Sequence, residues 1–174
     1  CAAKRRPHRR HCRPEAVSRS AIVLPDAGTA PIVGLLQSAQ ATLRLKIVEF
    51  DLPELVEAVA APARRGVKVR VLFNKAGRGG VSDNAAARAA LAAAGVEVAD
   101  APHKLSVVHE KSLVIDDERA LVMSCDWTAA GLSEARDYAL LTTHRHEVDE
   151  IAACFDADWA HQGFKPHGHG PLRL

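Results

Sequence analysis

Apolar and polar positions alternate along the chain with two different periods, which predict strands and helices in turn from about residue 20 onward. The segments LRLKIVEF and VKVRVLF place apolar side chains at every second position, the period of a half-buried strand. The segment LPELVEAV spaces its leucines and valines by three and four positions, the period of a helix. Asp51 is the expected N-cap of that helix, and Pro62 is expected to kink or end it.

The second half of the chain adds a helix, a hairpin and a closing helix. SDNAAARAALAAAG predicts a helix that Ser82 or Asp83 caps. LSVVHEKSLVID and RALVMSC predict two strands joined by a tight turn, and the last helix carries its apolar face from Val148 to Trp159. Repeated strand–helix–strand units with one hairpin predict an α/β fold, a three-layer α/β/α sandwich with a mixed sheet, over residues 20–163.

Composition fits a single domain of this kind. The 174 residues are 48% hydrophobic but only 4% aromatic, so we expect a core of alanine, valine and leucine. No apolar run reaches the roughly eighteen residues of a transmembrane helix, and no signal-peptide core follows the basic start, which favours a cytoplasmic location. The chain begins at Cys1, so we expect a processed chain or a piece of a longer product.

Charge is unevenly spread along the chain. Residues 1–14 contain six basic residues and no acidic one, whereas the remainder has 17 basic and 21 acidic residues, a net charge of −4. We interpret residues 1–19 as a basic, disordered arm, with a tether to nucleic acid or to an anionic surface as the alternative. The body lacks the basic footprint of a dedicated nucleic-acid binder. Residues 164–174 are interpreted as a C-terminal tail.

The cysteines predict neither a disulfide framework nor a metal site. The four cysteines are Cys1, Cys12, Cys125 and Cys154. They form no C-x-x-C pair, and the adjacent His11 and Cys12 do not have the spacing of a zinc finger. We therefore expect unpaired thiols in a reducing compartment.

Two polar residues interrupt the apolar run VVHEKSLVIDD at residues 107–117. On a strand, His109 and Lys111 would share one face, roughly 6.5–7 Å apart, which is about the span of a phosphate group held between them. Lys111 would supply a fixed positive charge, and His109 could act as nucleophile or proton shuttle. The pattern alone leaves a structural interpretation open, because lysine often guards an edge strand.

Further polar residues follow at the ends of the neighbouring predicted strands. Asp116 lies at the hairpin turn, and Ser124 ends the returning strand and offers a hydroxyl donor. Asp126 follows two positions later, and Asp137 opens the next strand, where it could hold an imidazole N–H. Trp127 could line the mouth of a site or fill the core.

His109, Lys111 and Asp116 form an HxKxxxxD pattern that resembles the signature of the phospholipase D superfamily. MSCDWT resembles the Gly-Ser-x-Asn element of that family, Arg136–Asp137 resembles its later acidic position, and the similarity covers roughly residues 20–163. The resemblance implies a metal-independent site without a cofactor, built from two such motifs. One histidine forms a phosphohistidine, the other protonates the leaving oxygen, and lysine with Ser124 stabilises the phosphoryl oxygens.

This chain has one such motif, so the resemblance implies a homodimer with facing motifs or a second lobe of a longer protein. Two positions depart from the family pattern: Met123 replaces the glycine and Asp126 replaces the asparagine. An ionised carboxylate only accepts hydrogen bonds, whereas an amide also donates them. Asp126 would therefore repel a phosphate unless it is protonated or turned away.

Three functions remain open at this point. The first is a phospholipase D-like phosphodiesterase, a phosphoric diester hydrolase acting on phospholipid or a related diester. The second is a dimeric endonuclease for DNA or RNA, which the basic arm favours and the acidic body disfavours. The third is a non-catalytic domain that binds phosphodiesters or pairs with another lobe, which Asp126 motivates.

Overall fold

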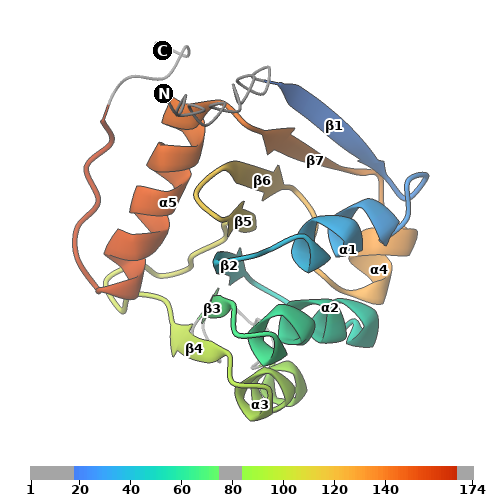
Figure 1. Ribbon diagram of the computed structural model, residues 1–174, viewed down its shortest axis with the longest axis horizontal. Coiled ribbons are helices and arrows are strands. Elements are labelled where there is room, and N and C mark those ends of the chain that lie inside the picture. The colour runs from blue at the N-terminus through green and yellow to red at the C-terminus, as the bar shows by residue number, and fades with distance from the viewer. Residues whose placement is uncertain (1–17, 75–83, 168–174) are drawn as a thin grey trace, which may run out of the picture.

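The computed structural model describes residues 18–74 and 84–167, which form a seven-stranded mixed sheet (Figure 1). The strand order is β1-β7-β6-β5-β2-β3-β4. β2, β3 and β4 pair in parallel, and the other neighbours pair antiparallel. The strands are β1 (Arg19–Leu24), β2 (Thr42–Ile47), β3 (Lys68–Phe73), β4 (Glu97–Asp100), β5 (Ser112–Ile115), β6 (Arg119–Met123) and β7 (Asp137–Thr142).

Helices cover both faces of this sheet, so the predicted three-layer sandwich with a mixed sheet is confirmed (Figure 1). α1 and α2 pack together on one face and α5 lies on the other, while α3 follows α2 toward the β4 edge. The helices are α1 (Ala30–Gln37), α2 (Pro53–Arg64), α3 (Ala85–Ala93), α4 (Ala129–Ser133) and α5 (Arg145–Trp159). No helix in the described ranges is long and apolar enough to cross a membrane.

The main core lies between the sheet and the helices α1, α2 and α3, and two smaller clusters lie beneath α5. Aliphatic side chains and alanines dominate the main core, as the composition predicts. Trp127 is nonetheless fully buried there, with its ring 5.0 Å from that of Phe50, so it fills the core and does not line a site mouth. Met123, at the family's glycine position, is also buried, and its sulfur accepts a hydrogen bond from the Trp127 indole.

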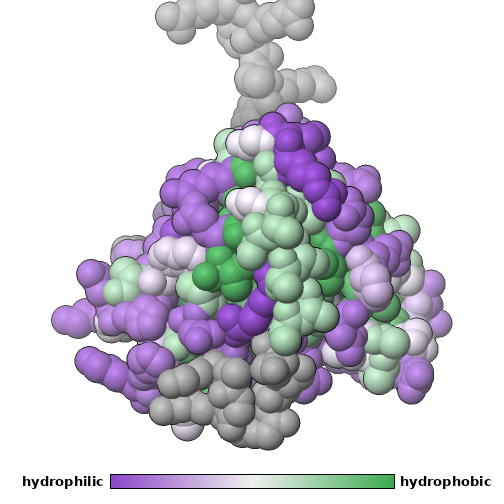
Figure 2. Space-filling model, turned by 90° about the horizontal axis from the view of Figure 1, so that it is seen from below, coloured by the Kyte–Doolittle hydropathy of each residue, from purple (hydrophilic) through white to green (hydrophobic). Residues whose placement is uncertain are grey.

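α3 presents a surface of small side chains to solvent. The view from below (Figure 2) shows a light green strip bordered by purple polar residues on this side of the molecule. The exposed alanines of α3 are Ala85, Ala86, Ala89, Ala90, Ala92 and Ala93. Ala87 and Leu91 are the buried residues of this helix. Alanine has the highest helix propensity, which favours this helix in addition to the packing of Ala87 and Leu91.

Two predicted helix starts differ from the structure. α2 begins at Pro53 with Leu52 at the N-cap position, so the prediction of Asp51 as the cap is wrong. The backbone N–H groups of Asp51 and Leu52 both donate to the Trp127 carbonyl, which holds the chain extended up to Pro53. α3 begins after Asn84, whereas the predicted caps at residues 82–83 lie outside the described residues.

The predicted break at Pro62 and the predicted long hairpin strand also need correction. Pro62 lies in the last turn of α2, which continues to Arg64, because a proline there removes only one bond near the helix end. β5 begins at Ser112, so residues 107–111 precede the strand instead of forming its first half. β1 begins at Arg19, so the last residue of the predicted arm belongs to the sheet, and residues 1–17 of that arm lie outside the described residues.

Candidate active site

The strand directions bring the predicted site residues to one edge of the sheet. β5 runs antiparallel to both β2 and β6, and β7 runs antiparallel to β6. The amino ends of β5 and β7 therefore meet the carboxyl ends of β2 and β6. The residues gathered at this edge are His109, Lys111, Ser124, Asp126 and Asp137.

His109 and Lys111 contact each other directly at this edge. The Lys111 ammonium lies 3.1 Å from Nε2 and 3.2 Å from Nδ1 of the His109 ring. His109 is exposed, whereas Lys111 is buried with 3% of its surface accessible. The Lys111 carbonyl accepts a hydrogen bond from the Met123 amide, which continues the β5–β6 ladder by one residue. The structure thus places an accessible imidazole in contact with a buried, positively charged ammonium.

Asp126 is held by two contacts at the side of Lys111. Its Oδ1 accepts a hydrogen bond from the Glu49 amide at 2.9 Å, and its Oδ2 lies 3.4 Å from the Lys111 ammonium. The carboxylate is therefore turned toward the loop after β2 and toward Lys111. This arrangement offsets the charge of Lys111, which a phosphate would otherwise meet unopposed.

Ser124 directly follows β6, as predicted, and pairs with Asp137. Its hydroxyl donates to the Asp137 carboxylate at 2.5 Å and accepts from the Tyr138 amide at 3.1 Å. Both residues lie beside the start of β7. Because the Asp137 carboxylate accepts from Ser124 here, its expected contact with an imidazole stays a prediction.

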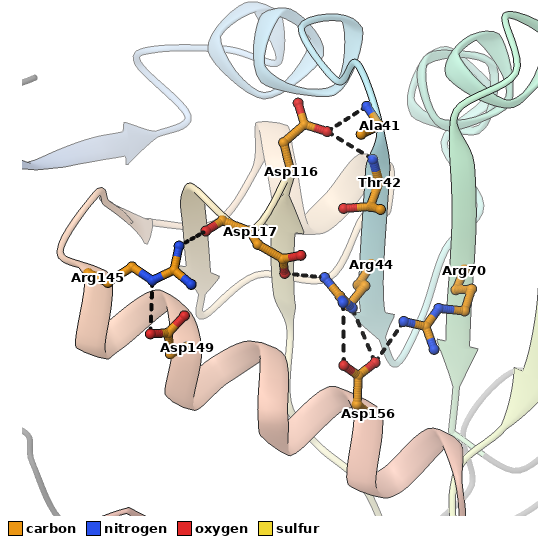
Figure 3. Close-up of polar contacts among 9 residues, drawn as sticks. All are labelled: Ala41, Thr42, Arg44, Arg70, Asp116, Asp117, Arg145, Asp149 and Asp156. Atoms are coloured by element: carbon orange, nitrogen blue, oxygen red, sulfur yellow. Dashed lines mark hydrogen bonds and ion pairs between the residues drawn. The ribbon is translucent and has the colours of Figure 1, made fainter. Parts of the chain in front are cut away.

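Asp116 lies at the opposite end of β5, so the structure does not bring it to His109 and Lys111. It lies five positions after Lys111, roughly 16 Å along an extended chain. Its carboxylate accepts backbone hydrogen bonds from Gln40, Ala41 and Thr42, at 3.0, 2.7 and 2.8 Å, and Figure 3 shows those from Ala41 and Thr42. Burial acts to raise the pKa of Asp116, but these N–H donors outweigh it and lower the pKa.

The turn beside Asp116 is also fastened to α5. The Asp117 carboxylate accepts from Arg44, and Asp156 on α5 accepts from both Arg44 and Arg70 (Figure 3). Arg145 donates to the Asp117 carbonyl at 3.2 Å from the first turn of α5. This end of the hairpin therefore carries contacts that join the turn, the sheet and the helix.

Sequence reasoning missed a buried charged cluster on the other side of the His109–Lys111 segment. The ammonium of Lys46, near the carboxyl end of β2, lies 2.7 Å from carboxylate oxygens of both Glu110 and Asp158. Lys46 has 0% of its surface exposed. The available signal was a lysine within the apolar run LRLKIV, but its partners lie 64 and 112 positions away along the chain.

The chain belongs to the phospholipase D superfamily, because residues 32–159 match the family model described as "Cardiolipin synthase, PLD-like domain". This match bears out the resemblance of the HxKxxxxD pattern. The fold also matches that of a phospholipase D family member, Nuc from Salmonella typhimurium, with a TM-score of 0.76. The sequence predicts a phosphodiesterase, and the members of this family are phosphodiesterases.

The chain is similar to two curated mitochondrial cardiolipin hydrolases. It is 30% identical to that of Xenopus tropicalis over 138 residues, which cover 77% of this chain and 62% of the relative. It is 25% identical to that of Canis lupus familiaris over 146 residues, which cover 84% of this chain and 56% of the relative. The chain thus spans less than two thirds of the length of these relatives.

Solved structures share the fold at low sequence identity. Salmonella Nuc is 18% identical, and the match covers 87% of this chain and 99% of that one. NucT from Helicobacter pylori has a TM-score of 0.68 at 15% identity, over 86% of this chain and 100% of that one. These matches extend over nearly the whole of both structures, so the described domain corresponds to one such unit.

Proposed function

We propose that this protein hydrolyses a phosphodiester through a phosphohistidine on His109, without a metal ion. The observation that carries the proposal is the accessible His109 imidazole against the buried Lys111 ammonium, at the edge that also holds Ser124. An uncharged imidazole nitrogen is a nucleophile near neutral pH. An ammonium and a hydroxyl are hydrogen-bond donors suited to phosphoryl oxygens.

The reaction proceeds in two steps. In the first, a ring nitrogen of His109 attacks phosphorus, the bond from phosphorus to the leaving oxygen breaks, and a second histidine protonates that oxygen. In the second, the same second histidine takes a proton from water, which attacks phosphorus and breaks the phosphorus–nitrogen bond. His109 is restored and a phosphomonoester is released. Lys111 donates to the phosphoryl oxygens in both steps, and the Ser124 hydroxyl does so once it has turned from Asp137 to the substrate.

The second histidine comes from a second copy of the chain, because the motif occurs once in this sequence. The sheet face formed by β6 and β7 beside the site supports such a partner. Val122 and Leu140 are opposite each other in register, and Tyr138 lies on the same face. These side chains are 44%, 57% and 54% exposed, a contiguous apolar surface next to Ser124. A second lobe of a longer protein is the alternative occupant.

The substrate class favoured here is a phospholipid diester. The curated relatives are named as cardiolipin hydrolases, which act on a lipid carrying phosphodiesters. DNA or RNA is the second candidate, and the six basic residues within residues 1–14 favour it.

Turnover of bis(p-nitrophenyl) phosphate in excess EDTA tests the proposal. Wild-type protein should release nitrophenol, and His109→Ala should not. His167→Ala is the matched control, because His167 is exposed and contacts Glu150 on α5. Vesicles containing cardiolipin and single-stranded DNA, compared under the same conditions, distinguish lipid from nucleic acid. Binding of either substrate without turnover would favour the non-catalytic domain instead.

A further inference from the structure

We propose that Glu110, through its ion pair with buried Lys46, is a positioning residue that fixes the backbone between His109 and Lys111. This inference rests on the proposed function, since it concerns how the nucleophile of that site is held. Glu110 touches neither reacting atoms nor substrate. It acts from the opposite face of the sheet, where α5 lies.

The side chains of this segment alternate between two environments. Lys111 points toward the site and contacts His109, whereas Glu110 and Ser112 point toward Lys46 and α5. One Glu110 oxygen lies 2.7 Å from the Lys46 ammonium, and the other accepts from the Ser112 hydroxyl at 2.6 Å. Lys46 and Ser112 are directly opposed in the β2–β5 register, so Glu110 is the diagonal neighbour of Lys46.

The buried Lys46 ammonium restricts where the Glu110 carboxylate can lie. Burial acts to lower the pKa of Lys46, but the charge of Glu110 and the hydrogen bonds that the ammonium donates to Asp158 and Glu110 outweigh it, so the pKa is raised. Lys46 therefore stays charged with no accessible surface. A buried charge that loses a partner is strongly destabilised, so Glu110 is constrained to the one position where it reaches Lys46.

The Lys46 ammonium is the cation of this cluster, so we do not interpret the cluster as a metal site. Glu110, Cys154 and Asp158 have potential ligand atoms within 4.8 Å of one another. The Lys46 ammonium is 2.7 Å from both carboxylates and 3.3 Å from the Cys154 sulfur, in the position that an ion would occupy. Burial raises the pKa of the Cys154 thiol, which keeps it protonated.

Residues 107–111 need a side-chain contact to fix their backbone, because they lie outside β5. On one side of His109, the Val108 amide donates to the buried Asn74 side chain at 3.1 Å. On the other side, the ladder begins only with the Lys111 carbonyl. Glu110 holds the residue between these points. An attacking nitrogen displaced by about 1 Å can lose roughly 100-fold in rate, so this constraint bears on kcat.

Paired alanine variants separate positioning from stability. Glu110→Ala and Asp158→Ala each remove one carboxylate from the same ammonium, so both should lower the melting temperature. We expect kcat for the aryl diester to fall about 10- to 100-fold in Glu110→Ala, with KM changed less than about 3-fold. In Asp158→Ala, kcat should stay within about 3-fold of wild type. Glu110→Gln keeps the length and an acceptor oxygen, and should recover part of kcat.

Two further measurements keep the inference testable if a single variant folds poorly or the wild type is inactive. Lys46→Met/Glu110→Gln/Asp158→Asn removes the ammonium and both of its carboxylate partners, so no buried charge is left unpaired, and this variant should regain stability but not kcat. Amide hydrogen exchange of the peptide 107–113, measured without substrate, should be faster in Glu110→Ala than in Asp158→Ala. Equal exchange in both variants, or kcat losses that follow melting temperature in both, would overturn the inference. An inactive wild type with the expected exchange difference would instead overturn the proposed function alone.

Discussion

At the amino end of β5, an exposed imidazole contacts a buried ammonium beside Ser124. At the carboxyl end, the Asp116 carboxylate accepts backbone hydrogen bonds from Gln40, Ala41 and Thr42, at and just before the start of β2, and Figure 3 shows those from Ala41 and Thr42. The residues at both ends belong to the same sequence motif. The spacing of the motif residues therefore spans β5 from end to end. Asp116, the last residue of the motif, anchors the turn after β5, while His109 and Lys111 form the candidate site before it.

The largest expected effect comes from removing the charge at the amino end. Lys111→Met keeps a buried aliphatic chain but loses the ammonium beside His109. We expect kcat/KM for the aryl diester to fall about 100- to 1,000-fold, because a preorganised donor to the phosphoryl group is lost. Steady-state kinetics of the folded variant checks this. A variant within 10-fold of wild type would remove Lys111 from the chemistry and weaken the contrast between the two ends.

Removing the Asp116 carboxylate at the carboxyl end of β5 should lower the stability of the protein and leave its turnover nearly unchanged. Asp116→Ala leaves the amides of Gln40, Ala41 and Thr42 without their carboxylate acceptor. We expect the free energy of unfolding to fall by about 1–2 kcal/mol, because the group is partly exposed and water replaces some of these bonds. Urea unfolding measures the loss, and kcat of the folded fraction should stay within about 3-fold. A loss of kcat without a loss of stability would return Asp116 to the site.

A smaller effect is expected at Asp126, where this chain departs from the family pattern. Asp126→Asn can keep the hydrogen bond from the Glu49 amide while removing the negative charge next to Lys111. We expect KM for the diester to fall about 3- to 10-fold, equivalent to roughly 0.6–1.4 kcal/mol in binding. If kcat instead falls sharply, the Asp126 carboxylate itself takes part in the reaction and does more than offset the charge of Lys111.

The smallest effect is a difference in pH dependence. Burial acts to raise the pKa of Asp116, but the backbone donors lower it overall, so the native state binds its proton more weakly than the unfolded chain does. Its contribution to stability is therefore complete above the unfolded pKa of about 3.9 and is lost as pH falls through the lower native pKa. The free-energy difference between wild type and Asp116→Asn should shrink below about pH 4. A constant difference would contradict this assignment.

The fold could be predicted from the sequence because its signals are local. Alternation in LRLKIVEF and the helical spacing after it do not depend on distant residues. Ser124 and Asp137 at the site edge follow once the strand order is known, since each lies at a predicted strand end, whereas His109 and Lys111 come to that edge because β5 begins only at Ser112. The resemblance to the phospholipase D superfamily named them before the sheet order was known.

The remaining features depend on tertiary contacts that no local pattern encodes. Lys46 reads as an ordinary strand residue until Glu110 and Asp158 meet it from distant segments. The start of α2 depends on the Trp127 carbonyl, which comes from a loop beyond β6. The first hairpin strand is predicted to start too early because apolar residues 107–108 continue its pattern without pairing in the ladder. Such positions need the register of the sheet, which the sequence alone does not supply.

Rapid-quench mass spectrometry of the enzyme with an aryl phosphodiester in EDTA tests the central claim most directly. The account predicts an acid-labile phosphoryl adduct on His109 that forms within one turnover, is absent from His109→Ala and persists in Asp116→Ala. Turnover without any adduct on His109, or an adduct on another residue, would contradict the assignment of the nucleophile to the amino end of β5.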